Sequence, residues 1–236
     1  MNKIAVAGAS GAMGSLLVDR LNAAGHEVVR ISRTDGVDLL TGEGLSEALQ
    51  GVSALIDVSQ VATLDHANPS VEISQAARNV VTAAEKAGVE RVVMLSINGV
   101  QKQSLQEFPF YQARYDQENI LLTCDVPTVV VRSTQWHEFA LNPAAVEQTE
   151  TEVKVQDWAV QPVPMAKVAD FLVDAALGNQ GQGIVTVTGP EQLRLPELTR
   201  RVLAEEGDAR QVVEVPAVLD ALADGSLHAP DDAVVL

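Results

Sequence analysis

The chain has few aromatic residues and a single cysteine, and both shortages narrow its chemistry. Of the 236 residues, 3% are aromatic and one is cysteine, Cys124. One cysteine cannot form a disulfide within the chain, and its apolar neighbours predict a small buried side chain rather than a nucleophile. The scarcity of aromatic rings predicts that any substrate pocket is lined mostly by aliphatic side chains.

Basic residues are also scarce. The chain has 16 lysines and arginines against 32 aspartates and glutamates, which gives a formal net charge of −16. This charge opposes binding to a phosphate backbone, so we expect neither a nucleic-acid partner nor a membrane partner. No apolar run approaches the about 18 residues of a membrane span, and the short N-terminal run is broken by glycine, unlike a secretory signal. We therefore expect a cytoplasmic protein.

Three glycines near the N-terminus have a spacing typical of nucleotide binding. An apolar run over residues 3–7 precedes Gly8, Gly11 and Gly14, and a helical stripe of leucines follows. Gly8 allows a sharp turn off a strand, Gly11 lets the backbone approach a pyrophosphate, and Gly14 lets the helix lie close to the sheet. Free N–H groups at the helix start would face the phosphates. The expected cofactor contacts here are Gly8, Ser10, Gly11, Ala12, Met13 and Gly14.

Strands alternate with helices through the first 132 residues. After the first strand, apolar runs predict strands at 27–33, 37–40, 53–59, 91–96 and 126–132. Helical patterns predict helices at 44–50, 70–87 and 109–124. This order predicts a Rossmann-type α/β fold, a doubly wound parallel sheet with right-handed crossovers, in which the strand at 53–59 lies beside the first.

The alternation weakens after residue 135. The later elements that we expect are a helix at 166–177, a strand at 184–188, a helix at 196–206 and a strand at 212–215. We therefore expect a single NAD(P)-binding domain over residues 1–236. Its dinucleotide-binding core would span residues 1–135, and a small C-terminal substrate or lid lobe would span residues 136–236.

The end of the second strand bears on which nicotinamide cofactor binds. An acidic residue there would favour NAD by accepting from the ribose 2′-OH, but the strand ends in Ser32 and Arg33. A hydroxyl and a guanidinium suit a 2′-phosphate, so we expect NADP(H), with Asp35 as the competing interpretation. Further cofactor contacts are expected from Asp38 and Leu39 near the adenine, and from Val58, Ser59 and Gln60 near the middle of the cofactor.

The glycine motif and the Ser32–Arg33 strand end, together with residues 131–135, 161–163 and 188–191, resemble the atypical short-chain dehydrogenase/reductases. The NmrA-like and sugar-epimerase-like NAD(P)-binding proteins are the closest members. The resemblance covers nearly the whole chain and implies NADP binding in an extended groove. Some members of this family sense the cofactor without turning it over.

The resemblance assigns the catalytic residues only in part. Short-chain reductases use a serine at the end of the fifth strand and a tyrosine four residues before a lysine. Ser96 fits the serine position, Arg114 falls at the lysine position, and Phe110, which has no proton to give, falls at the tyrosine position. Tyr111 lies about 100° away around the helix. The candidate catalytic residues are therefore Ser96, Tyr111 and Arg114, of which Ser96 and Arg114 are also candidate cofactor contacts.

Three functions stay open. The leading one is an NADP(H)-binding oxidoreductase that reduces a small carbonyl or quinone-like acceptor, with Gln135, Trp136 and Phe139 as candidate substrate contacts or core residues. The alternative is a non-catalytic NADP(H) sensor that acts through a protein partner. A sugar-nucleotide epimerase ranks lower because it needs a working tyrosine. No cluster has metal-ligand spacing, so we expect no metal, and a homodimer is compatible with each function.

Overall fold

The computed structural model describes residues 2–61 and 68–236, and its centre is a parallel sheet. The strands of this sheet are β1 (Lys3–Ala7), β2 (Glu27–Ile31), β3 (Ala54–Asp57), β4 (Arg91–Ile97), β5 (Thr128–Ser133), β9 (Gly183–Thr188) and β12 (Val234–Val235). Their order is β12-β9-β5-β4-β3-β1-β2, and each neighbouring pair runs parallel. The expected Rossmann-type α/β fold is confirmed, including the position of β3 beside β1.

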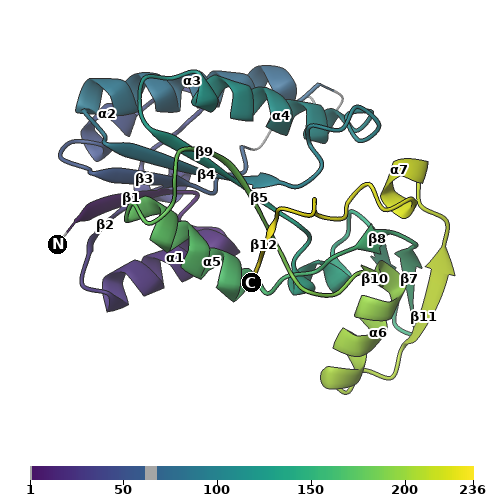
Figure 1. The fold of residues 1–236 in the computed structure, drawn as a ribbon. Helices are drawn as coiled ribbons and strands as arrows, with labels where there is room; N and C mark the ends of the chain where they lie inside the picture. The colour runs from purple at the N-terminus through teal and green to yellow at the C-terminus, as the bar shows by residue number, and fades with distance from the viewer. Residues whose placement is uncertain (1, 62–67) are drawn as a thin grey trace.

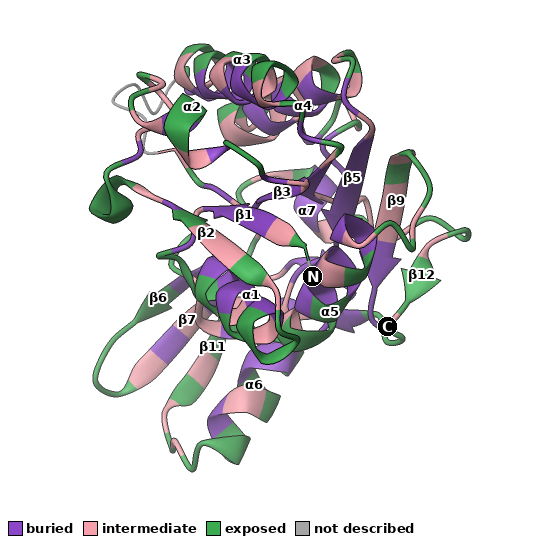
Figure 2. Cartoon of the chain, turned by 90° about the vertical axis from the view of Figure 1, so that its left-hand side faces the viewer, coloured by how far each residue is buried: buried purple, intermediate pink, exposed green. Residues whose placement is uncertain are grey.

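Helices cover both faces of this sheet (Figure 1). The layer of α2 (Leu45–Ala48), α3 (Ser70–Ala87) and α4 (Pro109–Leu122) lies on one face, and α1 (Ala12–Ala23) with α5 (Met165–Ala176) lies on the other. Alternate residues of β1 face the two layers, because side chains alternate along a strand: Ile4 and Val6 pack with α1, and Ala5 and Ala7 pack on the α3 side. Figure 2 shows the buried inner faces and exposed outer faces that this packing produces.

The strand expected at residues 37–40 does not form, and that expectation was wrong. The Asp38 side chain accepts hydrogen bonds from the backbone N–H groups of Leu40, at 2.7 Å, and Thr41, at 3.2 Å. The backbone of Asp38 also accepts from the N–H of Gly42 at 2.8 Å. These local bonds use the groups that a strand would offer to its neighbours, so the segment turns instead.

The residues after 135 divide between two places. Helix α5 and strands β9 and β12 complete the central sheet and its core. The remaining elements pack around a hydrophobic cluster of their own, which includes Trp158, Leu198 and Leu222. They are η2 (His137–Leu141), β6 (Val146–Gln148), β7 (Glu152–Gln156), β8 (Ala159–Val160), β10 (Leu193–Arg194), α6 (Leu195–Glu205), β11 (Gln211–Val215) and α7 (Asp220–Ala223). We call this group the C-terminal lobe (Figure 1).

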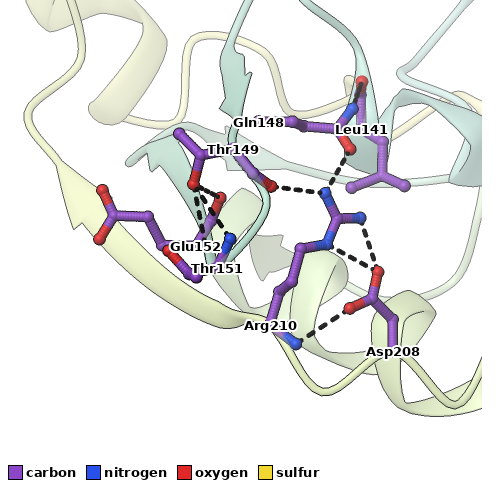
Figure 3. Close-up of polar contacts among 7 residues, drawn as sticks. All are labelled: Leu141, Gln148, Thr149, Thr151, Glu152, Asp208 and Arg210. Carbon is purple, nitrogen blue, oxygen red and sulfur yellow. Dashed lines mark hydrogen bonds and ion pairs between the residues drawn. The ribbon is translucent and has the colours of Figure 1, made fainter.

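A surface network fixes the outer sheet of the C-terminal lobe, whose order is β11-β7-β6. Figure 3 shows Arg210 between the β6–β7 turn and the loop before β11. Its guanidinium donates to the Gln148 side chain at 3.1 Å, to the Thr149 carbonyl at 3.3 Å and to Asp208 at 2.8 Å. Hydrogen bonding to Arg210 lowers the pKa of Asp208 below its usual value.

Within the described residues, no helix is both long enough and apolar enough to cross a bilayer.

Candidate functional site

The turn between β1 and α1 can be built only from glycine at two positions. Gly8 has φ +83°, and a Cβ there would lie 2.8 Å from the Ser59 Cα atom. A Cβ on Gly14 would lie 2.0 Å from the Gly8 carbonyl oxygen. The first glycine therefore lets the turn pass beside the end of β3, and the third lets α1 lie against the turn, as the sequence predicts.

Gly11 has a different role in this turn. It takes the N-cap position of α1 in an extended conformation, and its N–H donates to the Gly8 carbonyl at 3.0 Å. The first α-helical bond runs from the Ser15 N–H to the Gly11 carbonyl, at 2.8 Å. The N–H groups of Ala12, Met13 and Gly14 come before that bond, so they are donors that an α-helix leaves for other acceptors, and an anion is well suited to them.

A groove of about 160 Å³ opens beside this turn, at the carboxyl ends of β1, β2 and β3. Eight of the expected cofactor contacts line it: Gly8, Ser10, Ser32, Arg33, Asp38, Leu39, Ser59 and Gln60. Two of these residues belong to the glycine turn, and the other six follow β2 and β3. The other expected contacts lie outside this lining. Met13, Gly14, Ser96 and Arg114 are buried, Val58 packs against the core, and Gly11 and Ala12 are exposed.

The end of β2 contributes Arg33, the one cation among the described residues that line the groove, in the short turn η1 (Arg33–Asp35). Its side chain is exposed. Asp35, the competing residue, does not line the groove. Its carboxylate accepts from Arg30 Nε at 3.3 Å and from the Ser32 hydroxyl. Both carboxylate oxygens of Asp35 therefore already accept hydrogen bonds from other protein groups.

Arg114 points into the protein, where α4 crosses the ends of β3 and β4. Only 7% of its surface is exposed. Its guanidinium donates to the side chain of Gln117 at 2.7 Å, to the Ser59 carbonyl at 3.4 Å and to the Leu95 carbonyl. Burial lowers the pKa of Arg114, and the charges of Asp57 and Glu118 oppose that shift. Two of its three nitrogens thus bind protein acceptors, which differs from the cofactor contact that the family motif implies.

The two other candidate catalytic residues lie in different surroundings. Ser96 is 2% exposed, and no described residue accepts from or donates to its Oγ. The ring of Tyr111 packs with Phe108, at a centroid distance of 6.3 Å, and against the core of the C-terminal lobe. Burial raises the pKa of Tyr111, which keeps its phenol protonated and opposes the phenolate that the family mechanism uses.

The three candidate substrate residues do not form one cluster. The Trp136 Nε1 donates to Ser133 Oγ at 3.0 Å, and its ring packs against the central core. Phe139 packs on Trp158 in the C-terminal lobe, at 5.4 Å between ring centroids, so the core-packing interpretation holds for it. Gln135 is 7% exposed and its Oε1 has no described partner.

Unpartnered buried polar atoms gather at the carboxyl edge of the sheet. In the described part of the chain, those outside Arg20 are Ser59 Oγ, Ser96 Oγ, Asn98 Oδ1, Arg114 Nε, Gln135 Oε1 and His228 Nε2. Buried polar groups are normally paired, so a ligand or ordered water at this edge would complete their hydrogen bonds. Asn98 also binds the carbonyls of Leu227 and His228, at 2.8 and 3.1 Å, and so ties the C-terminal segment to β4.

The sequence reasoning missed several polar residues of this region. Asp57 is the last residue of the apolar strand β3, and Arg132 is the residue before the last of β5. Each is a lone charge in an apolar run, which is a signal for a buried partner. Those partners lie on α4, at Gln117 and Glu118, and no local pattern identified them. Over residues 2–61 and 68–236, no group of three His, Cys, Asp or Glu side chains is placed to hold a metal.

Comparisons with known proteins agree with the fold. No curated protein matches the chain. Among solved structures, the dTDP-4-dehydrorhamnose reductase from Bacillus anthracis in complex with NADP is 15% identical with a TM-score of 0.75, over 94% of this chain and 86% of that one. The Bordetella bronchiseptica enzyme WbmG in complex with NAD is 18% identical with a TM-score of 0.70, over 100% and 84%.

A UDP-N-acetylglucosamine 4-epimerase from Bacillus cereus has the same fold, at 12% identity and a TM-score of 0.70, over 92% of this chain and 86% of that one. At the level of the fold, the resemblance to the short-chain reductase and epimerase-like proteins is therefore confirmed. Residues 8–178, more than two thirds of the chain, match a family described as NAD(P)H-binding, and the match starts at the first glycine of the turn. The chain belongs to the NAD(P)H-binding family.

Proposed function

We propose that the protein is an NADP(H)-dependent oxidoreductase that reduces a small carbonyl or quinone-like acceptor. The observation that carries the proposal is the groove, which has the glycine turn on one side and Ser32 with Arg33 on another. The turn fits a pyrophosphate because glycine at positions 8 and 14 lets the chain pass tightly into α1, whose first N–H groups have no acceptor within the helix. Neighbours of the same fold bound to NADP or NAD support a nicotinamide cofactor.

NADP(H) is favoured over NAD(H) by the charges at the end of β2. Arg33 lines the groove and is exposed, and no described residue forms an ion pair with it. A 2′-phosphate would give it a charge-assisted partner. The carboxylate of Asp35, which would prefer a ribose hydroxyl, is held by Arg30 and Ser32 instead.

The chain's own groups suit an acceptor that needs little proton transfer from the protein. A bound nicotinamide supplies the hydride. Ser96 offers a buried hydroxyl, free of described partners, to the oxygen of the acceptor. Tyr111 keeps its proton because burial raises its pKa, and Phe110 has none to give. A quinone-like acceptor, which can take its proton from water after the hydride, fits this set better than a reaction that depends on a phenolate.

Arg33→Ala tests the cofactor preference. We expect NADPH affinity to fall by at least about tenfold, because a charge-assisted hydrogen bond contributes about 1.5–3 kcal/mol. NADH affinity should change less than about threefold, because NADH has no 2′-phosphate. Arg78→Ala is the matched control, since Arg78 is exposed on α3 and outside the groove lining. Calorimetric titration of both variants measures the two affinities. An equal loss for NADPH and NADH would contradict the 2′-phosphate assignment.

Oxidation of NADPH by a panel of quinones and small carbonyls tests the activity. We expect turnover with at least one acceptor and a loss of about 100-fold in kcat in Ser96→Ala, with NADPH affinity unchanged, because one donor to the reacting oxygen is removed. A cofactor sensor is the second candidate function, favoured by the inward-facing Arg114. It predicts tight NADPH binding without oxidation by any acceptor.

A further inference from the structure

The wall of the groove next to the glycine turn is held in place by buried side chains behind it. Ser59, Gln60 and Val61 contribute this wall, directly after β3. The backbone of Ser59 is also the part of the chain that a Cβ on Gly8 would meet, at 2.8 Å. The wall and the glycine turn therefore touch, and a displacement of Ser59 would change the width of the groove.

Four residues close a ring of hydrogen bonds around Ser59. The Ser59 N–H donates to Asp57 Oδ1 at 2.9 Å, and the Ser59 carbonyl accepts from Arg114 at 3.4 Å. Gln117 joins the other two, because it donates to Asp57 Oδ2 at 3.4 Å and accepts from Arg114 at 2.7 Å. Both backbone groups of Ser59 are thus held by side chains, one from β3 and one from α4.

The ring is buried, which makes it stiff. Asp57, Arg114 and Gln117 are 2%, 7% and 3% exposed, so water does not compete for their hydrogen bonds. The positive charge of Arg114 lies near the negative charge of Asp57, which raises the pKa of Arg114 against the effect of burial. A buried charge that is paired and hydrogen-bonded resists displacement, because each step away from its partners exposes an uncompensated charge.

We propose that Arg114 is a positioning residue: it holds Ser59 in place and thereby sets the groove wall formed by residues 59–61. The inference rests on the proposed function, because the wall matters for a cofactor that lies in the groove. It assigns to Arg114 a role different from that of the lysine whose position it takes. Arg114 acts through the backbone of Ser59.

The ion pair between Glu118, also on α4, and Arg132 on β5 is an example of a purely structural role. Three contacts join Glu118 and Arg132: Arg132 Nε donates to Oε1 at 3.0 Å and to Oε2 at 3.2 Å, and a terminal nitrogen donates to Oε2 at 2.6 Å. They are as buried as the ring, and within the described residues no hydrogen bond joins either side chain to a residue that lines the groove. The charge of Glu118 also acts on Arg114, so this control leaves the hydrogen bonds of the ring in place and changes only that attraction. The double substitution Glu118→Leu with Arg132→Met removes this pair without leaving a lone charge, and so it is the matched control.

The experiment compares Arg114→Met, Arg114→Lys and the double control in two measurements on the full chain. The first is hydrogen exchange of the Ser59 amide without cofactor. We expect about tenfold faster exchange in Arg114→Met, an intermediate rate in Arg114→Lys, and an unchanged rate in the control. The second is NADPH affinity, which we expect to fall about tenfold in Arg114→Met and less than about threefold in the control.

Unchanged exchange at Ser59 in Arg114→Met, or equal acceleration in the control, would overturn the proposal. If Arg114→Met does not fold, Gln117→Leu removes another member of the ring and is held to the same expectations. Exchange is measured without cofactor, so failure of the wild-type chain to bind NADPH would refute the proposed function while the exchange rates still decide the role of Arg114.

Discussion

Gly14→Ala is expected to destabilise the protein by about 3 kcal/mol or more and to abolish NADPH binding. Alanine in a helix interior is normally favoured over glycine, by about 1 kcal/mol. Here the added Cβ would stand 2.0 Å from the Gly8 carbonyl oxygen and 2.8 Å from the Ala9 Cα atom. Both are backbone atoms that no rotamer change can move, so α1 must shift off the glycine turn, and the clash outweighs the helix preference.

Gly11→Ala is the internal control for this prediction. Its Cβ would lie 3.4 Å from the same Gly8 oxygen, an ordinary contact, and Gly11 has a φ of −80° that alanine adopts readily. Urea denaturation should therefore show a change below about 1 kcal/mol, because no mechanism for a large loss is present. NADPH affinity should still fall, since the new methyl group stands where phosphates approach the helix start. Equal stability losses in the two variants would contradict this account of the turn.

The sequence was sufficient for features that local pattern determines. The spacing of Gly8, Gly11 and Gly14 predicts the strand–turn–helix unit because backbone sterics leave few residues able to form it. The parallel sheet follows from alternating apolar runs and helical stripes. The segment at 37–40 shows where local pattern fails, since a side-chain bond of Asp38 to its own backbone outcompetes the strand that the apolar residues favour.

The candidate site was only partly predictable, for a different physical reason. Motif alignment gave the position of Arg114 on α4 but not the direction of its guanidinium. That direction depends on the carbonyls of Ser59 and Leu95, which lie 55 and 19 residues away in the chain. Glu118 and Arg132 are likewise paired across 14 residues and two elements. Partners of this kind are chosen by packing of the whole fold, which periodicity does not encode.

Glu118→Ala is expected to lower the free energy of unfolding by about 3–5 kcal/mol, because it leaves a buried guanidinium without its counter-charge. Glu118 is fully buried, and Arg132 is 8% exposed. Three nitrogen–oxygen contacts between 2.6 and 3.2 Å join them, and they are the hydrogen bonds that the structure gives to the Arg132 guanidinium. The ion pair of Arg200 with Glu214 is exposed, so Glu214→Ala should lower the free energy of unfolding by less than about 1 kcal/mol.

The double substitution Glu118→Leu with Arg132→Met measures how much the intact ion pair contributes to the free energy of unfolding, apart from the destabilisation caused by leaving one charge unpaired. Taking both charges out of the interior removes the desolvation penalty together with the attraction, and apolar side chains of similar size fill the space. We expect the double variant to recover most of the stability that Glu118→Ala loses, within about 1–2 kcal/mol of the wild type. Urea denaturation of both variants measures this. A double variant as unstable as Glu118→Ala would mean that the pair itself, and not the stranded charge, stabilises the junction of α4 and β5.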